Sequence, residues 1–317
     1  MDRQLIDRAV TGEDPSADVW SGETESDHAQ LVVAVRELVA TRRLGAPASR
    51  AALVHLMAEW GLALASAVIG LVADRLAVWI VVWFVMAWVL AGNAALNHEA
   101  VHGHLFRSKA ANRVVGVAAL APLFGSFATF RAYHWQHHAL TARPGDPEGT
   151  PLSFRSRFLY AAVLLVGGIA VLVENLVYTI ITVAGHPPTW ARASRHRRAI
   201  RWNALLVAAT VVLAVVGMYF DPAVTLEVWL VPAGIATVVL LPLLLLPEHY
   251  GATGEGDIVS NTRSIQSNRL LRWFYWNTNY HAAHHVAPSV SFNRIEEIDD
   301  ALLEQARLDP NGGFVRI

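Results

Sequence analysis

Four long apolar segments constrain the fold of this chain more than any other feature of its sequence. Each has about the 20 residues that an α-helix needs to cross the hydrocarbon core of a bilayer. They form two pairs, each joined by a short polar turn: 51–73 with 76–96, and 202–220 with 226–246. We therefore predict an all-α integral membrane protein with four transmembrane helices in two hairpins.

The composition agrees with a membrane protein and excludes several functional classes. Charged residues make up only 16% of the 317 residues, whereas soluble domains carry about 25%. The net charge of −1 excludes a nucleic-acid-binding protein of the usual basic kind. Because the chain has no cysteine, it forms no disulfide, iron–sulfur cluster or thiolate zinc site.

Polar segments flank the apolar region. Residues 1–50 read as a polar N-terminal tail that ends in a surface helix from about Asp27 to Arg43. Residues 293–317 read as a cytoplasmic C-terminal tail, which leaves 51–292 as a single membrane domain. The first residues lack the basic region and short apolar stretch of a cleaved signal peptide, so we expect none.

Prolines interrupt two of the apolar segments. Pro232 and Pro242 lie inside the last predicted transmembrane helix, where each should kink it. Pro122 and Gly125 interrupt 114–130, which we therefore expect to be buried or interfacial.

Nine of the 14 histidines form a pattern. Within three clusters the spacings of three and four place imidazoles on one face of a helix. The pattern His-x-x-His-His occurs twice, against roughly 0.03 occurrences expected by chance at this histidine frequency. A ninth histidine follows the last apolar segment in the string Glu-His-Tyr-Gly. The nine are His98 and His102, then His134, His137 and His138, the isolated His249, and finally His281, His284 and His285.

Nine neutral imidazoles exceed the ligands of a single metal ion and suit two. Imidazole binds iron, copper, nickel or zinc, but an open zinc site needs only three or four protein ligands. The number therefore favours two redox metal ions. Asp146 and Glu148, just after the second cluster, are candidates to accept the remaining N–H of metal-bound imidazoles, and Glu99, Glu248 and Asp257 are weaker candidates.

The other five histidines have less specific interpretations. His104 shares the first cluster but lies about 240° around the helix from His98 at 100° per residue. We expect it to support the site rather than to bind a metal. The remaining four should be solvated or lie at a span entrance or in a loop: His28, His55, His186 and His196.

A fifth apolar segment, 157–185, is long enough to cross a membrane, but its flanking loops argue against a crossing. The basic loops 107–113 and 192–201 should both stay cytoplasmic under the positive-inside rule. A single crossing would separate them and would also separate the histidine clusters. We therefore expect a re-entrant or interfacial helical pair, broken near Glu174 and Asn175, with both termini and the active site on the cytoplasmic side of the inner membrane.

The clusters resemble the histidine boxes of the membrane fatty acid desaturase/hydroxylase superfamily, which includes acyl-lipid desaturases, alkane hydroxylases and β-carotene ketolases. The third cluster is most similar to a bacterial branch in which Asn-Thr-Arg-Ser precedes Trp-Asn-x-x-Tyr-His-x-x-His-His. This chain has these strings at 261–264 and 276–285. The resemblance extends from about Ala51 to Phe292 and implies that 51–292 is a catalytic domain.

The resemblance implies two Fe ions (Fe²⁺/Fe³⁺) held by the nine histidines, with O₂ as co-substrate. It also implies an external electron donor, a ferredoxin or rubredoxin with its reductase, a bilayer environment and a lipid-like substrate. In the alkane-hydroxylase pattern Asn-x-x-x-His-Tyr-Gly, the position four before His249 is Leu245 here. Asn277 lies four residues before His281 and is a candidate to support the site.

These features favour an O₂-dependent oxidoreductase that attacks an unactivated C–H bond of an acyl chain, with desaturation as the first interpretation. The alternative on the same di-iron site is a hydroxylase or monooxygenase of an alkyl, terpenoid or specialised-metabolite substrate. A histidine-rich metal transporter would need ligands along a pathway through the spans, and a hydrolytic zinc enzyme would use fewer imidazoles. Metal analysis separates these classes.

Overall fold

The computed structural model describes residues 27–148, 156–187, 197–250, 258 and 261–308. These residues form helices and loops, without a strand among them. The main helices are α3 (Asp27–Arg42), α4 (Ser49–Ala73), α5 (Leu76–His102), α6 (Lys109–Leu120), α7 (Phe127–Leu140), α8 (Arg157–Val183), α10 (Arg197–Phe220), the run from α11 to η4 (Pro222–Glu248), α14 (Arg269–Phe274), α15 (His281–Val286) and α16 (Glu296–Leu308).

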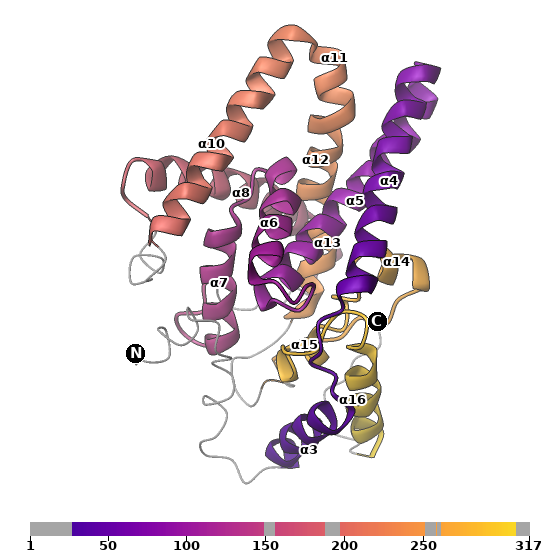
Figure 1. The fold of residues 1–317 in the computed structure, drawn as a ribbon, viewed down its shortest axis with the longest axis vertical. Helices are drawn as coiled ribbons and strands as arrows, with labels where there is room; N and C mark the ends of the chain where they lie inside the picture. The colour runs from indigo at the N-terminus through magenta and orange to yellow at the C-terminus, as the bar shows by residue number, and fades with distance from the viewer. Residues whose placement is uncertain (1–26, 149–155, 188–196, 251–257, 259–260, 309–317) are drawn as a thin grey trace.

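Five helices in the described part of the chain are long and apolar enough to cross a membrane, or up to six if the bent pair α6 and α7 forms one span. Four of them correspond to the predicted segments and run near the long axis of the molecule (Figure 1). Asp74 turns the chain between α4 and α5 in a left-handed conformation (φ 43°). Asp221 turns it between α10 and α11, where its carboxylate accepts a hydrogen bond of 3.0 Å from the Val224 N–H.

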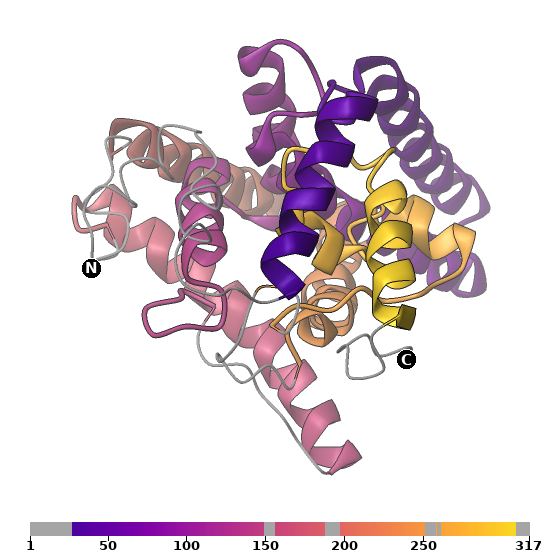
Figure 2. The same cartoon turned by 90° about the horizontal axis from the view of Figure 1, so that it is seen from below.

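The fifth candidate, α8, corrects one prediction. The expected break near Glu174 and Asn175 is wrong, because the helix continues unbroken through both residues. No proline or glycine lies near Glu174 and Asn175 to interrupt the backbone, and the Asn175 carbonyl accepts a hydrogen bond from the Thr179 hydroxyl within the helix (2.8 Å). Figure 2 shows α8 as the long pink helix that reaches toward the lower edge, across the direction of the other four candidates.

The two prolines of the last apolar helix are accommodated by π-helical turns, at Leu226–Leu230 and Ala236–Leu240. A proline ring clashes with the carbonyl four residues earlier and offers it no N–H, and a wider turn relieves this conflict. For Pro242 that carbonyl belongs to Val238. There α8 crosses so closely that a Cβ on Gly168 would lie 2.6 Å from the Val238 oxygen, so only glycine fits.

The bent pair α6 and α7 confirms the interruption expected within 114–130. The two helices differ in direction by 102°. Pro122 opens a short 3₁₀ turn, and the Ser126 hydroxyl caps α7 by accepting a hydrogen bond of 3.3 Å from the Thr129 N–H. The bend returns α7, which carries the second histidine cluster, to the C-terminal end of α5.

Two further helices cover the third histidine cluster at the lower end of the molecule (Figure 1). Val35 of α3 and Leu44, which follows α3, share one buried cluster with Ile298 and Leu302 of α16. Ala283 of α15 lies in the same cluster. The short helix α15 therefore has packed support on the side away from the long apolar helices.

A buried carboxylate ties α4 to the loop before α15. Glu59 is fully buried and accepts a hydrogen bond of 2.8 Å from the Trp276 indole N–H. His55, one helical turn earlier, lies 3.5 Å from the other carboxylate oxygen and stacks on the Trp276 ring with centroids 4.0 Å apart. His55 was expected only at a span entrance and Glu59 was not predicted to have a role, although the two stand at i, i+4 on one helix face.

We predict that Glu59→Leu lowers the stability of the folded protein by about 1–3 kcal/mol, because it leaves the buried Trp276 N–H without an acceptor. Glu59→Gln retains an acceptor oxygen and should cost less. Thermal unfolding in detergent measures both. If the double variant Glu59→Leu/Trp276→Phe is no more stable than the sum of the two single changes implies, the hydrogen bond is not the cause.

Candidate metal centre

The first histidine cluster occupies the last turn of α5. The helix ends because Gly103 adopts a left-handed conformation (φ 78°), and its N–H bonds to the carbonyls of Glu99 (3.1 Å) and Ala100 (3.2 Å). His98 and His102 are one turn apart on the same face. Both imidazoles therefore leave the helix in one direction, at its end.

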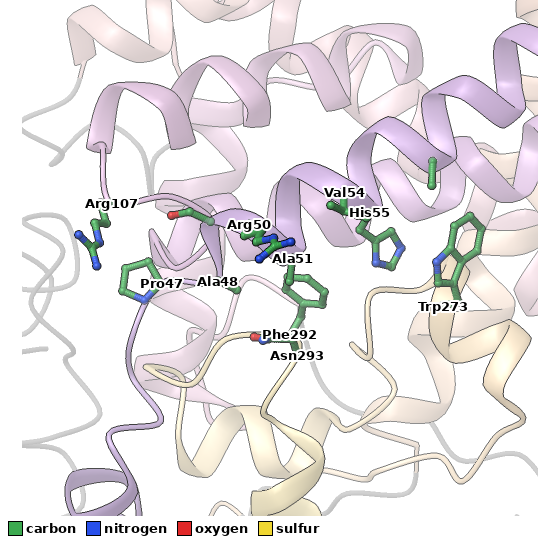
Figure 3. Close-up of a pocket in the computed structure, with 12 residues that line it drawn as sticks. Pro47, Ala48, Arg50, Ala51, Val54, His55, Arg107, Trp273, Phe292 and Asn293 are labelled. Atoms are coloured by element: carbon green, nitrogen blue, oxygen red, sulfur yellow. The ribbon is translucent and has the colours of Figure 1, made fainter.

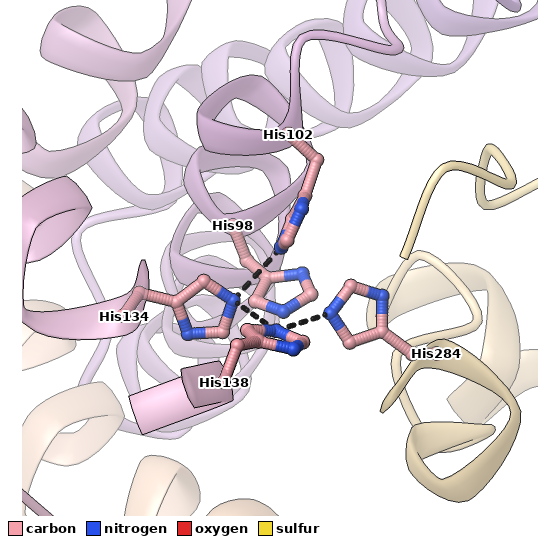
Figure 4. A group of neighbouring side chains, drawn as sticks. All are labelled: His98, His102, His134, His138 and His284. Atoms are coloured by element: carbon pink, nitrogen blue, oxygen red, sulfur yellow. Dashed lines mark hydrogen bonds between the residues drawn. The ribbon is translucent and has the colours of Figure 1, made fainter. Parts of the chain in front are cut away.

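Five imidazoles from three helices meet beside this turn, and Figure 4 shows them pointing at one another. Each offers a nitrogen within 4.8 Å of the others. Neighbouring Nε2 atoms are 2.8 Å apart between His102 and His134, and 3.0 Å apart both between His134 and His138 and between His138 and His284. His98 completes this first group.

A second group of four imidazoles lies beside the first. It unites His137, His249, His281 and His285, again with one nitrogen from each within 4.8 Å of the others. The Nε2 atoms of His249 and His281 are 2.9 Å apart, and those of His281 and His285 are 3.0 Å apart. The two groups touch where the rings of His138 and His285 stack, with centroids 4.3 Å apart.

Helix geometry keeps some histidines of a cluster together and separates others. Residues four apart project from the same side of a helix, so each i, i+4 pair stays in one group. Helices α7 and α15 each carry one further histidine, which directly precedes the second member of the pair on that helix. This histidine is rotated from that member by about 100° and joins the opposite group. The first group takes His134 with His138 and the single His284, and the second takes His281 with His285 and the single His137.

The donor set in both groups fits metal ions. Two nitrogens bound at about 2.1 Å to one ion and at right angles to each other would be about 3 Å apart, which is the spacing observed. The His98 Nε2 atom is buried and has no hydrogen-bond partner among the described residues. A buried nitrogen in that situation is costly unless a cation binds it.

Metal ligands must be neutral imidazoles, and burial favours the neutral form of His249 and of the third cluster. It lowers the pKa of His281, His284 and His285 well below the usual value of histidine. Burial and the neighbouring His137 lower the pKa of His249 to about 3. Near neutral pH their lone pairs are therefore available without the loss of a proton.

The sequence-predicted Asp146 lies against the second group. Its carboxylate oxygens lie 3.0 and 3.1 Å from His137 Nδ1, and it accepts hydrogen bonds from the N–H groups of Ala142 (2.8 Å) and Glu148 (2.9 Å). The loop after α7 thus fixes the carboxylate. The carboxylate in turn holds the imidazole with Nε2 toward the group, the usual arrangement behind a metal-bound histidine.

Glu148, the other candidate of this loop, also lies close to the second group. Its carboxylate approaches His137 Nδ1 at 3.6 Å and His249 Nε2 at 3.9 Å. These distances exceed a hydrogen bond. Glu148 therefore supplies negative charge beside the imidazoles rather than a direct contact.

Two weaker candidates also lie beside the Nδ1 atoms of histidines in the two groups. Glu248 lies 3.5 Å from His281 Nδ1 and accepts a hydrogen bond of 3.0 Å from the Tyr275 hydroxyl. Glu99 lies 3.5 Å from His98 Nδ1. Each of these carboxylates is buried and stands behind an imidazole of a different cluster.

His104 and Asn277 lie outside both groups. The chain leaves helical geometry at Gly103, so His104 follows the end of α5 rather than continuing around it, and its carbonyl accepts the Ala48 N–H (2.9 Å). The Asn277 amide donates to the Phe292 carbonyl (2.9 Å) and so braces the loop before α15. Asp257 lies outside the described residues.

Two contacts of the grouped imidazoles were not predicted. His249 Nδ1 donates to the Asn261 carbonyl at 2.8 Å, and the Thr141 hydroxyl lies 3.4 Å from His285 Nδ1. A backbone acceptor carries no side-chain signal in a sequence. The only available hint was that Asn261 opens the Asn-Thr-Arg-Ser string.

Comparison with known protein families identifies the family of this chain. Residues 74–311 match the family described as fatty acid desaturase, a range that contains all nine clustered histidines. A search of curated proteins finds no match.

We predict that His249→Ala lowers the bound metal and abolishes turnover, because it removes one of the four nitrogens of the second group. His104→Ala is the matched control and should retain metal and activity, since His104 lies outside both groups. Metal content per folded chain is measured together with expression, because metal binding couples to folding. Loss of metal in His104→Ala but not in His249→Ala would overturn both assignments.

Proposed function

The chain belongs to the fatty acid desaturase family, and on that premise we propose that it is an O₂-dependent di-iron membrane enzyme that desaturates an acyl chain. Family membership makes it a membrane oxidoreductase. The observation that carries the finer proposal is the division of nine imidazoles into two adjacent groups of five and four. An all-imidazole set of this size suits two redox-active ions better than one zinc ion.

The protein would hold one iron ion with each group. Bound there, the two ions would supply the oxidising power to remove hydrogen from an unactivated C–H bond. In the balanced reaction the substrate loses two hydrogens, the external donor supplies two electrons with two protons, and O₂ becomes two waters.

The surrounding residues orient the ligands and keep water out. Asp146 and the Asn261 carbonyl fix the His137 and His249 rings from behind, so little reorganisation is needed when metal binds. Seven of the nine histidines are buried, with His137 and His138 each 1% exposed, and His102 and His249 are partly exposed. A site closed to water protects a strongly oxidising centre from side reactions.

We further propose four transmembrane helices, with α8 at the cytoplasmic face. The direction of α8 across the bundle supports this proposal (Figure 2), because a helix that lies across the others does not share their path through the bilayer. Both termini, the histidine groups and the docking site of a ferredoxin or rubredoxin would then be cytoplasmic.

We predict about two iron atoms per purified chain, and activity that is lost on chelation and restored by Fe²⁺. Incubation with a ferredoxin, its reductase, ¹⁸O₂ and acyl-lipid substrates should give products that are two hydrogens lighter and free of ¹⁸O. A product that carries one ¹⁸O would identify the hydroxylase alternative. Full activity with one zinc and no iron would refute the di-iron proposal.

Single-cysteine labelling tests the topology, since the chain has no cysteine of its own. We expect Arg75→Cys, in the turn between α4 and α5, to react with a membrane-impermeant reagent added outside. Lys109→Cys and Arg201→Cys, at the beginning of α6 and α10, should both be protected. If α8 crossed the membrane, these two positions would lie on opposite sides and only one would be protected.

A further inference from the structure

A groove of about 1010 Å³ lies along the first turns of α4, outside the metal centre (Figure 3). Arg107 lies toward one end, Arg50 near the middle beside Ala51, and Trp273 toward the other end (Figure 3). No histidine of the two metal groups lines the groove. It therefore needs an explanation separate from metal binding.

The part of the groove from Arg107 to Arg50 has positive charge without a matching negative charge among the described residues. Arg50 and Arg107 are both exposed, and neither forms a salt bridge with a carboxylate among the described residues. The first turn of α4 contains no acidic residue, and Ala48 provides no side-chain cap. The exposed backbone N–H groups of this turn add to the positive potential of the two guanidinium groups.

The other end of the groove is continuous with the apolar surface of α4. Val54 is 63% exposed and lies on the same helix face as Met57 and Leu64, which are also exposed. Because α4 is a candidate membrane span, this face meets lipid chains. His55 stacks on the Trp273 indole at 4.9 Å with the rings nearly parallel, which holds this part of the groove wall in place.

We propose that the groove binds an anionic phospholipid of the bilayer. The phosphate lies between Arg50 and Arg107, and an acyl chain follows Val54 and Ala58 toward Trp273. A phosphate has several oxygens that can accept hydrogen bonds from both guanidinium groups, and it fits them better than a single carboxylate would. The apolar end, which opens onto a lipid-facing surface, favours a membrane lipid over a soluble phosphate. The proposal requires only that α4 spans the membrane and does not depend on the reaction at the metal centre.

Binding is tested on the purified full chain in neutral detergent. Phosphatidylglycerol and phosphatidylcholine with identical acyl chains are titrated, and bound lipid is counted by native mass spectrometry. The wild type should bind one phosphatidylglycerol in preference to phosphatidylcholine. The double variant Arg50→Gln/Arg107→Gln should bind phosphatidylglycerol about tenfold or more weakly, because both charge-assisted contacts are lost.

Arg75→Gln is the matched control, since Arg75 is an exposed arginine at the opposite end of α4. It should bind phosphatidylglycerol like the wild type. Equal metal content in all variants shows that each is folded. The proposal is overturned if the double variant binds like the wild type, if the control loses binding equally, or if wild-type protein does not discriminate between the lipids. Competition by inorganic phosphate at the same concentration would identify a soluble phosphate as the ligand instead.

Discussion

Nine imidazoles direct their nitrogens into two adjacent small volumes, and they come from α5, α7, the residue just after η4, and α15. A cation is needed to make such crowding favourable. Buried nitrogens about 3 Å apart cannot all be protonated, and they cannot all satisfy one another as donors and acceptors. Metal ions would resolve the conflict by accepting every lone pair. Bound metal would therefore stabilise the relative positions of four elements that are distant in sequence, together with apolar packing.

The surrounding polar contacts hold this arrangement from outside. Asp146 stands behind His137, the Asn261 carbonyl behind His249, and Glu248 near His281. Glu59 extends the support into the bundle, since its hydrogen bond to Trp276 joins α4 to the loop that precedes α15. Displacement of α4 would thus be transmitted to the third histidine cluster through this buried hydrogen bond and through the stacking of His55 on Trp276.

The same helix, α4, relates the site to the membrane in a second way. Its inner face carries Glu59, and its first turns form part of the groove that Arg50 and Arg107 line. A phospholipid bound there would fix the depth of α4 in the bilayer. The histidine groups at the end of α5 would then keep a constant position relative to the lipid surface, where a membrane substrate must enter.

The sequence by itself determined the long apolar helices and the nine clustered histidines, because both depend on local periodicity. Apolar runs of about 20 residues and spacings of three and four have the same meaning in any helical context. It also indicated Asp146, since a carboxylate soon after a histidine cluster is close to it in space.

Only the tertiary structure decided how the nine divide into five and four, because His284 and His137 join groups whose other members come from distant helices. It also decided that α8 continues through Glu174 and Asn175 and lies across the bundle. The charges in its flanking loops constrain only the two ends of that helix, not its backbone. The Glu59–Trp276 hydrogen bond joins residues 217 positions apart, and no local pattern specifies such a pair, since the packing of α4 against the loop before α15 creates it.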